Sequence, residues 1–274
     1  MIDAAAPDVL ALQEVGDPRA LDDLVALLDG SWDVATSTVF QRGHPIRVAV
    51  VSRLPIREVD QISAFPQRLA PVQAGDDGAT LDAMPRGALR VRAGDLELLA
   101  CHLKSKLLTF PGGRFAPRNE GERARYAAYA LQRRGAEAVT VRGAADALLV
   151  GAGDERMVVV LGDLNDEPLA ATTQVFLGPP GSEIGTGGFD RPDRGDPWRL
   201  WNLTPLIPEE RRFTRVFEGR GEVIDHILVS HHLVNRTRSV DTAGAVPASI
   251  TTDPRPRRDD LASDHSPVFA RFDV

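Results

Sequence analysis

Polar side chains that could do acid–base or metal chemistry stand at the ends of several short apolar segments. They are Glu14 in VLALQEV, His102 in LELLACHLKSK, Asp163 and Asn165 in VVVLGDLND, and Asp225 in VIDHILVS. Residues two apart on a strand share a face, so Asp163 and Asn165 lie on one side of their strand. Because ligands in α/β proteins bind where strands end and loops open, these side chains are expected to meet in one site.

Each residue also fits an ordinary structural role when it is taken alone. Glu14 could be a solvated strand end, His102 a hydrogen-bonded core histidine, and Asp163 a cap for the following turn. The same alternation points His226 away from the face that carries Asp225. The occurrence of several such strand ends in one chain favours chemistry over a set of unrelated structural roles.

Strands and helices alternate without a break in composition, which predicts a single domain over residues 1–274. Apolar runs predict strands at residues 9–15, Ile46–Val51, Ala88–Arg92, Leu96–Leu103, Met157–Leu161 and Val223–Ser230. Helices are predicted to begin at Asp17 and at Pro168, and residues 178–197 to form a long surface excursion. A long helical segment follows the loop Thr109–Asn119, and Gly135 and Gly143 could bend or split it.

The composition is that of a globular protein without a membrane span. Of the 274 residues 43% are hydrophobic, and no apolar run approaches the roughly 20 residues that cross a bilayer. The single cysteine, Cys101, excludes an internal disulfide framework, and the first residues lack the basic leader and apolar core of a signal peptide. A cytoplasmic location is the default expectation, with secretion as the alternative if the chain begins late.

The charge of the chain argues against indiscriminate binding to polyanions, because the formal net charge is -7. Lys104 and Lys106 are the only lysines among 32 basic residues, so the positive charge is almost entirely guanidinium. Arginine binds phosphate with a planar fork of donors. Arg114 and Arg118, in the loop before the long helix, are therefore candidate substrate contacts, with an ordinary surface role as the alternative.

The segments LQEV, HLKSK, LGDLND, IDHILVS and SDHSPV occur in this order between Pro7 and Phe269. In this series they resemble the motifs of the endonuclease/exonuclease/phosphatase superfamily, the fold of pancreatic deoxyribonuclease, abasic-site endonucleases and inositol-phosphate phosphatases. The resemblance implies an α/β (α+β) fold, a four-layer sandwich of two mixed β-sheets packed face to face with helices outside. It also implies a first strand ending in Asn. That strand is missing here, and exposed backbone edges and a cavity are the expected consequence.

The resemblance further implies a divalent-metal site for phosphoester hydrolysis at one rim of the sandwich. It makes Glu14 the principal ligand of Mg²⁺ or Mn²⁺ and gives Asp264 an assisting place, since hard carboxylate oxygens suit both ions. Asp163 would hold or deprotonate the attacking water, and Asn165 would orient it.

Two histidines complete the site that the resemblance implies. His265 would bond the scissile phosphate or act as the acid or base, with Asp225 fixing its tautomer. His102 would contact the phosphate or protonate the leaving oxygen. The general base stays open between Asp163 and His265, and Asp163 is the preferred choice.

Three functions fit these residues. The first is a metal-dependent phosphodiesterase, favoured as a nuclease that hydrolyses DNA or RNA by in-line water attack, with nucleic acid as its partner. The second is a phosphomonoesterase acting on a small phosphorylated metabolite or a lipid head group. The third is a weakly active or non-catalytic member of the fold, which the missing strand favours. The sequence indicates no obligate protein partner.

Overall fold

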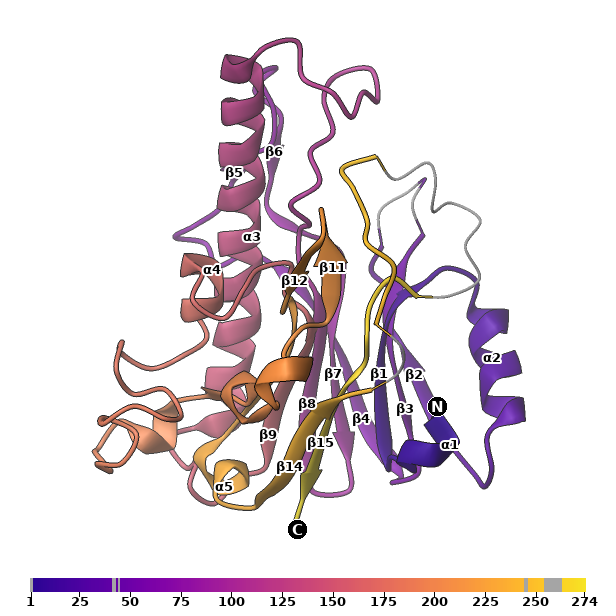
Figure 1. The fold of residues 1–274 in the computed structure, drawn as a ribbon, viewed down its shortest axis with the longest axis vertical. Helices are drawn as coiled ribbons and strands as arrows, with labels where there is room; N and C mark the ends of the chain where they lie inside the picture. Colours follow the sequence, from indigo (N-terminus) through magenta and orange to yellow (C-terminus); the bar gives the residue numbers. More distant parts are fainter. Residues whose placement is uncertain (1, 41–42, 44, 244–245, 254–262) are drawn as a thin grey trace.

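Two β-sheets pack face to face in this protein, and helices cover their outer faces, so that four layers follow one another (Figure 1). The computed structural model describes residues 2–40, 43, 45–243, 246–253 and 263–274. The predicted mixed α/β sandwich is confirmed. No helix within these ranges is both long enough and apolar enough to cross a membrane.

The larger sheet has six strands in the order β10-β13-β9-β8-β7-β4. They are β4 (Ile56–Ala64), β7 (Ala83–Ala93), β8 (Leu96–His102), β9 (Val158–Asp163), β10 (Trp201–Asn202) and β13 (Asp225–Val229). β8 and β9 run parallel, whereas the other neighbours run antiparallel. Both faces of this sheet are buried, since Leu99 and Cys101 belong to one apolar core and Leu98 and Ala100 to another.

The second sheet consists of β1 (Val9–Val15), β3 (Arg47–Ser52) and β2 (Asp33–Thr36), in the order β1-β3-β2. A separate pair, β14 (Thr237–Thr242) and β15 (Val268–Phe272), packs on the same core. Among the described residues, neither β1 nor β15 has a strand partner on its second edge. Residues of both strands border one open hollow of about 2960 Å³, which continues to the rim of the sandwich.

The helix α3 (Glu120–Leu149) covers the outer face of the larger sheet and supports the parallel pair β8 and β9. Its first turn is capped by the side chain of Asn119, which accepts a hydrogen bond from the backbone N–H of Glu122. Gly135 and Gly143 lie inside this one continuous helix. Packing along its length outweighs the roughly 1 kcal/mol that each glycine costs.

The remaining helices are short. α2 (Pro18–Leu27) begins after Asp17, as predicted, and covers the outer face of the second sheet, while α1 (Ile2–Ala5) and α5 (His231–Val234) are single turns. The predicted helix start at Pro168 is wrong, because α4 spans only Ala171–Gln174.

Small elements surround the rim where the sheets end. The hairpin β5 (Val72–Gln73) and β6 (Thr80–Leu81) lies beside the first half of α3 (Figure 1). β11 (Arg215–Phe217) pairs with β12 (Arg220–Glu222), which directly precedes the start of β13. Three 3-10 turns complete the fold, at Asp196–Trp198, Thr204–Leu206 and Glu209–Arg211. Residues 178–195 form turns without strand or helix, as predicted.

Candidate active site

Strand register places three predicted site residues side by side at one rim of the sandwich. His102 stands opposite Asp163 in the β8–β9 ladder, and Asp163 stands opposite Asp225 in the β9–β13 ladder. Each is an even number of residues from apolar side chains of the core between the sheets, such as Leu98 and Val159. The three side chains therefore share the inner face of the larger sheet, as the alternation of the sequence predicts.

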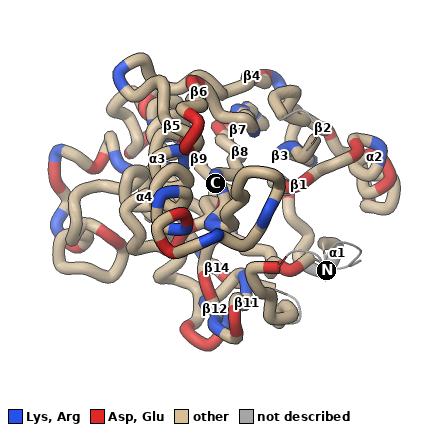
Figure 2. Tube along the Cα trace, turned by 90° about the horizontal axis from the view of Figure 1, so that it is seen from above, with Lys and Arg blue, Asp and Glu red and all other residues tan. Residues whose placement is uncertain are grey.

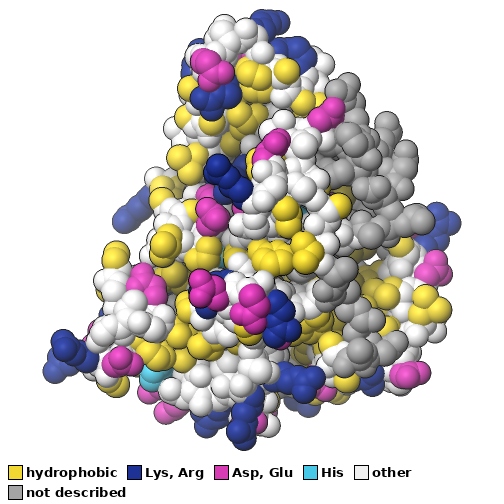
Figure 3. Space-filling view, viewed as in Figure 1, with side chains coloured by type: hydrophobic (Ala, Val, Ile, Leu, Met, Phe, Trp, Pro, Cys, Tyr) yellow, Lys and Arg dark blue, Asp and Glu magenta, His cyan; other side chains and the backbone are white. Residues whose placement is uncertain are grey.

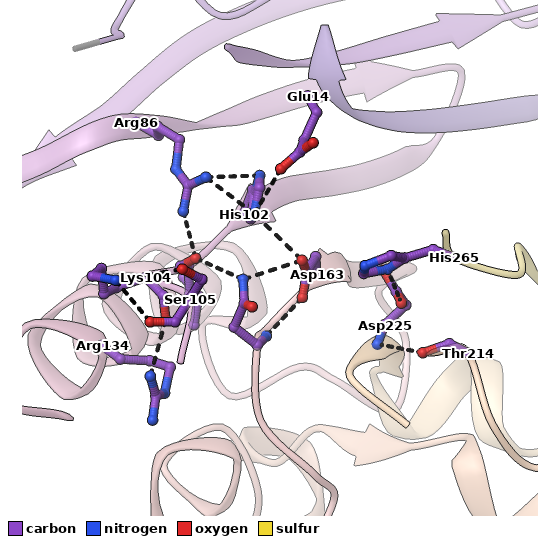
Figure 4. Close-up of polar contacts among 12 residues, drawn as sticks. Glu14, Arg86, His102, Lys104, Ser105, Arg134, Asp163, Thr214, Asp225 and His265 are labelled. Carbon is purple, nitrogen blue, oxygen red and sulfur yellow. Dashed lines mark hydrogen bonds and ion pairs between the residues drawn. The ribbon is translucent and has the colours of Figure 1, made fainter. Parts of the chain in front are cut away.

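Glu14 reaches the same rim through a β-bulge. Leu10 and Leu12 pack toward α2, so uninterrupted alternation would send Glu14 to that outer face. The register of β1 with β3 shifts between Leu12 and Val15, and Glu14 itself has a φ of 57°. The extra residue reverses the alternation. As a result, Glu14 Oε1 lies 4.0 Å from His102 Nε2 (Figure 4).

The turn after β9 fixes the carboxylate of Asp163. The backbone N–H of Asn165 donates to Asp163 Oδ1 at 2.8 Å, and Asn165 Nδ2 donates to Asp163 Oδ2 at 3.1 Å and to the carbonyl of Leu103 at 3.0 Å. The turn requires a φ of 54° at Asn165, which asparagine tolerates. Gly162 is needed because a Cβ there would lie 2.0 Å from the carbonyl oxygen of Cys101. The amide oxygen of Asn165 has no donor among the described residues and remains available to a ligand.

His265 is held against β13 by a short hydrogen bond. Its Nδ1 lies 2.7 Å from Asp225 Oδ2 (Figure 4). Asp225 is anchored in turn, because its backbone N–H donates to Thr214 Oγ1 at 3.2 Å. Burial opposes the charged imidazolium, but the hydrogen bond and the charges of Asp225, Asp163 and Asp264 outweigh it and raise the pKa of His265 to about 9. His265 is therefore a cation at neutral pH, with Nε2 left to face a substrate.

The environment of Asp163 disfavours its charged form, whereas the environment of His265 favours the charged form. Burial, and after it the negative charge of Asp225, raise the pKa of Asp163 to about 7. The charges of His265 and Arg215 and the hydrogen bond from Asn165 act in the other direction. A carboxyl with this pKa can take up and release a proton near neutral pH.

His102 is sandwiched between a guanidinium and a carboxylate. Arg86 Nη1 lies 3.2 Å from His102 Nδ1 and 3.1 Å from its Nε2. A nitrogen nearly equidistant from both ring nitrogens cannot lie in the ring plane without colliding with Cε1, so the guanidinium lies over the ring face. Burial, followed by the charge of Arg86, holds the pKa of His102 well below its usual value. The neutral ring places Nε2 at 3.3 Å from Asp163 Oδ2.

The acidic side chains at this rim fit a hard divalent cation. Ligand atoms of Asp163, Asp225 and His265 lie within 4.8 Å of one another. Glu14 adds a carboxylate whose side chain is 68% exposed, and Asp264 is near enough for its charge to raise the pKa of His265. Carboxylate oxygens are preferred ligands of Mg²⁺ and Mn²⁺. Asp163 and Asp225 already accept hydrogen bonds from Asn165 and His265, so the least constrained carboxylate is that of Glu14.

The two arginines predicted to bind substrate are not among the residues that line the hollow at the rim. Arg114 donates to Glu122 Oε1 at 2.9 Å and to the carbonyls of Pro111 and Ala116 at 3.1 and 2.7 Å. The backbone N–H of Arg118 donates to the other oxygen of Glu122 at 2.5 Å. Arg114 thus organises the loop before α3, and a substrate contact by either arginine stays a prediction.

Several cations at the rim were not predicted from the sequence. Arg86 comes from β7 and Arg133 from α3, where no motif distinguishes them from other arginines. Lys104 belongs to the HLKSK segment, but this motif did not assign it a role. Arg215 also lines the hollow, and its Nε is buried without a hydrogen-bond partner among the described residues.

Known proteins share this fold. The model of the Endonuclease/Exonuclease/phosphatase family matches residues 1–265. A 3′ phosphatase from Neisseria, solved bound to a product DNA hairpin, is 18% identical with a TM-score of 0.56, over 100% of this chain and 91% of that chain.

Two further solved structures are similar over the whole chain. An AP endonuclease from Archaeoglobus fulgidus is 16% identical with a TM-score of 0.55, over 100% of this chain and 91% of its own. A mannosyl-6-phosphatase from Bacteroides thetaiotaomicron is 15% identical with a TM-score of 0.56, over 100% and 88%. No curated protein sequence matches. At these identities the solved structures establish the fold and leave the substrate open.

Proposed function

Since the chain belongs to the endonuclease/exonuclease/phosphatase family, we propose that it is a divalent-metal-dependent phosphodiesterase acting on nucleic acid. One observation carries the proposal: His102, Asp163 and Asp225 stand in adjacent ladders, with His265 bonded to Asp225. This row combines a carboxyl with a pKa of about 7 and an imidazolium with a pKa of about 9. Between these values, Asp163 is an available base and His265 an available acid.

In-line attack of water on phosphorus accounts for the position of each group. Asp163 takes a proton from the water as the new bond from oxygen to phosphorus forms. The amide oxygen of Asn165 accepts the second hydrogen of that water and so fixes its direction. The bond from phosphorus to the leaving oxygen breaks, and His265 Nε2 donates its proton to that oxygen. Asp225 keeps the imidazole in the orientation that this transfer needs.

The remaining residues stabilise negative charge on the phosphoryl group. His102 is neutral and lies beside Asp163, so it can donate one hydrogen bond to a phosphoryl oxygen. Glu14 and Asp264 are the residues proposed to hold Mg²⁺ or Mn²⁺. When bound, the cation polarises the bonds of phosphorus to oxygen.

A phosphomonoesterase acting on a small phosphorylated molecule is the second candidate, and the distribution of charge favours it. The net charge is -7, and Lys and Arg are interspersed with Asp and Glu rather than gathered into one basic face in the views drawn (Figures 2 and 3). The structural similarity to a mannosyl-6-phosphatase is in keeping with it. The 3′ phosphatase of the same fold is also a phosphomonoesterase, but it is bound to a DNA hairpin rather than to a small molecule.

The experiment compares phosphodiester and phosphomonoester substrates under metal control. Plasmid DNA, RNA, bis(p-nitrophenyl) phosphate and p-nitrophenyl phosphate are incubated with Mn²⁺ or Mg²⁺, and in parallel with chelator. We expect the diesters to be hydrolysed with metal and to be stable in chelator. Turnover of the monoester alone would establish the second candidate, and diester hydrolysis that continues in chelator would overturn the metal-dependent proposal.

A further inference from the structure

Three cations lie near His102. We call Arg86, Lys104 and Arg133 the basic cluster. Arg86 lies over the face of His102 and donates from Nη2 to the carbonyl of Leu103 at 2.6 Å. Each of the three charges lowers the pKa of His102, so all three act on the ring that borders Asp163. The basic cluster therefore begins directly beside the predicted catalytic row (Figure 4).

Among the described residues, one carboxylate forms hydrogen bonds with the basic cluster. Glu137 is the carboxylate that contacts it in the described chain: it accepts from Arg133 Nε at 2.8 Å and from the backbone N–H of Lys104 at 2.5 Å. The amine of Lys104 donates to carbonyls, those of Ser105 at 2.8 Å and Leu107 at 2.7 Å. Glu137 is thus the one carboxylate that hydrogen-bonds the basic cluster within the described residues, and the charges of Glu14 and Asp163 also act on Arg86.

Burial makes this excess of positive charge costly. Desolvation, then the charges of Arg133 and Arg86, lower the pKa of Lys104 to about 8. Desolvation also lowers the pKa of Arg86, and the charge of Arg133 adds to this effect. Like charges in a partly desolvated place disfavour one another, and an anion that enters relieves the repulsion.

An anion can reach the basic cluster from the catalytic row. All three cations line the same open hollow as Glu14 and Asp163. Arg133 is 16% exposed, and its two terminal nitrogens have no hydrogen-bond acceptor within the described ranges. These two nitrogens of the guanidinium can donate a bidentate pair of hydrogen bonds to a phosphate.

Two other arginines of α3 differ from Arg133 because their terminal nitrogens form hydrogen bonds or ion pairs within the protein. Arg134 is 7% exposed and pairs with Asp166 at 3.1 Å. Arg125 pairs with Asp76 at 3.0 Å, at the outer end of the helix. The charges of Arg125 and Arg134 are neutralised by these ion pairs, so an external anion would gain less from binding to them.

We propose that Arg86, Lys104 and Arg133 bind a second, non-reacting phosphate group of the substrate. The inference rests on the proposed function, because it places this phosphate next to the one that is hydrolysed. Asp163 lies on one side of His102 and Arg86 and Lys104 on the other (Figure 4), and Arg133 lines the same hollow, so the ligand that fits carries two neighbouring phosphates. A polynucleotide strand offers this arrangement, and so does a small bisphosphorylated molecule.

Binding without turnover tests the subsite directly. Inorganic phosphate is titrated calorimetrically into metal-free protein in chelator, so that no hydrolysis intervenes. We expect Arg133→Gln to weaken phosphate binding roughly tenfold or more, because a charge-assisted hydrogen bond is lost, and Arg133→Lys to recover part of it. Arg123→Gln is the matched control: it changes an arginine of the same helix that is 51% exposed and paired with Glu120. Equal affinities in the wild type and in Arg133→Gln would overturn the subsite.

Substrate preference provides the second arm. Dithymidylate with and without a terminal phosphate, on the 5′ or the 3′ end, is compared with the methyl ester of glycerol phosphate with and without a second phosphate. We expect the added phosphate to raise kcat/KM roughly tenfold in the wild type, and Arg133→Gln to reduce that ratio toward one. A preference in the nucleotide pair or in the glycerol pair identifies the source of the phosphate.

The two arms separate failure of the subsite from failure of the proposed function. If no ester is hydrolysed but phosphate binding depends on Arg133, the phosphodiesterase proposal fails and the subsite stands. If esters are hydrolysed and neither the ratio nor phosphate affinity responds to Arg133→Gln, the subsite fails and the function stands. Lys104→Met gives a second variant, and a cooperative thermal transition confirms that each variant is folded.

Discussion

The two sides of His102 are built in different ways. On the acidic side, Asp163 and Asp225 stand opposite each other in the β9–β13 ladder. Glu14 joins them through a bulge in the facing sheet. On the basic side, Arg86, Lys104 and Arg133 come from a strand, a loop and a helix, and meet because α3 packs on the sheet. Ladder register fixes positions to within a residue, whereas helix packing adjusts to the side chains between the layers.

This difference suggests a division of labour. Acid–base chemistry depends on placement to a fraction of an ångström, which a ladder provides. Holding a non-reacting phosphate depends mainly on charge, which tolerates a looser construction. Substitutions on the acidic side should therefore reduce turnover, and substitutions on the basic side should reduce affinity.

Asp163→Asn has the largest expected effect. The amide keeps the size of the side chain but cannot accept the proton of the attacking water. We expect kcat to fall roughly 10³-fold, measured on the best diester substrate at saturating metal. Asp154→Asn is the control, since it lies in the turn before β9, at the other end of that strand. A loss below about threefold would remove Asp163 from the role of base.

His265→Gln and Asp225→Asn should be non-additive. If Asp225 acts through His265, the double variant will lose no more activity than His265→Gln alone, about 10²-fold. Asp225→Asn alone should lose less, since the imidazole remains. The three variants form a cycle measured by kcat, with His232→Gln of α5 as the control. Fully additive losses would mean that the 2.7 Å hydrogen bond has no part in catalysis.

Glu14→Gln should weaken metal binding without altering the fold. The side chain is 68% exposed and makes no hydrogen bond that holds the bulge within the described residues. We expect the Mn²⁺ concentration for half-maximal activity to rise roughly tenfold, and the stabilisation of the protein by Mn²⁺ in thermal unfolding to shrink accordingly. The exposed Glu210→Gln serves as control. An unchanged Mn²⁺ response would place the cation elsewhere.

The pH dependence of kcat/KM should form a bell between the two shifted groups. Below a pKa of about 7 Asp163 becomes protonated and loses its function as base, and above a pKa of about 9 His265 loses its proton and its function as acid. In Asp225→Asn the hydrogen bond that raises the pKa of His265 is weakened, so the alkaline limb should move to lower pH by about one unit. A higher metal concentration should move the acidic limb to lower pH, because a cation favours ionised Asp163. An alkaline limb that stays in place in Asp225→Asn would assign it to another group.

The acidic side could be predicted from the sequence because short segments encode it. GDLN sets Asp163 and Asn165 within one turn, and alternation along the strands points His102 and Asp225 to the same face. The bulge at Glu14 was not visible, since plain alternation sends Glu14 to the outer face. Its place at the rim was expected from its position at a strand end and from the resemblance. The helix predicted to begin at Pro168 was also wrong: Pro168 and the turn after it are not helical, and α4 begins only at Ala171.

The basic side could not be predicted because nothing local encodes it. Arg86 and Arg133 are separated by a strand, a loop and the first half of a helix, and many arginines in the chain look like them. Their distinction is that both line the same hollow as Glu14 and Asp163, which only the packed structure reveals. Conversely, the sequence made the loop arginine Arg114 a candidate substrate contact, but in the structure its guanidinium donates a hydrogen bond to Glu122.

The most direct test of this division is a comparison of kcat and KM for Asp163→Asn and Arg133→Gln on one doubly phosphorylated diester. The account predicts that Asp163→Asn loses activity in kcat, with KM changed little, and that the loss in Arg133→Gln falls mainly on KM, by roughly tenfold. A loss in kcat for Arg133→Gln as large as that for Asp163→Asn would contradict it, because both sides of His102 would then act on the reacting phosphate.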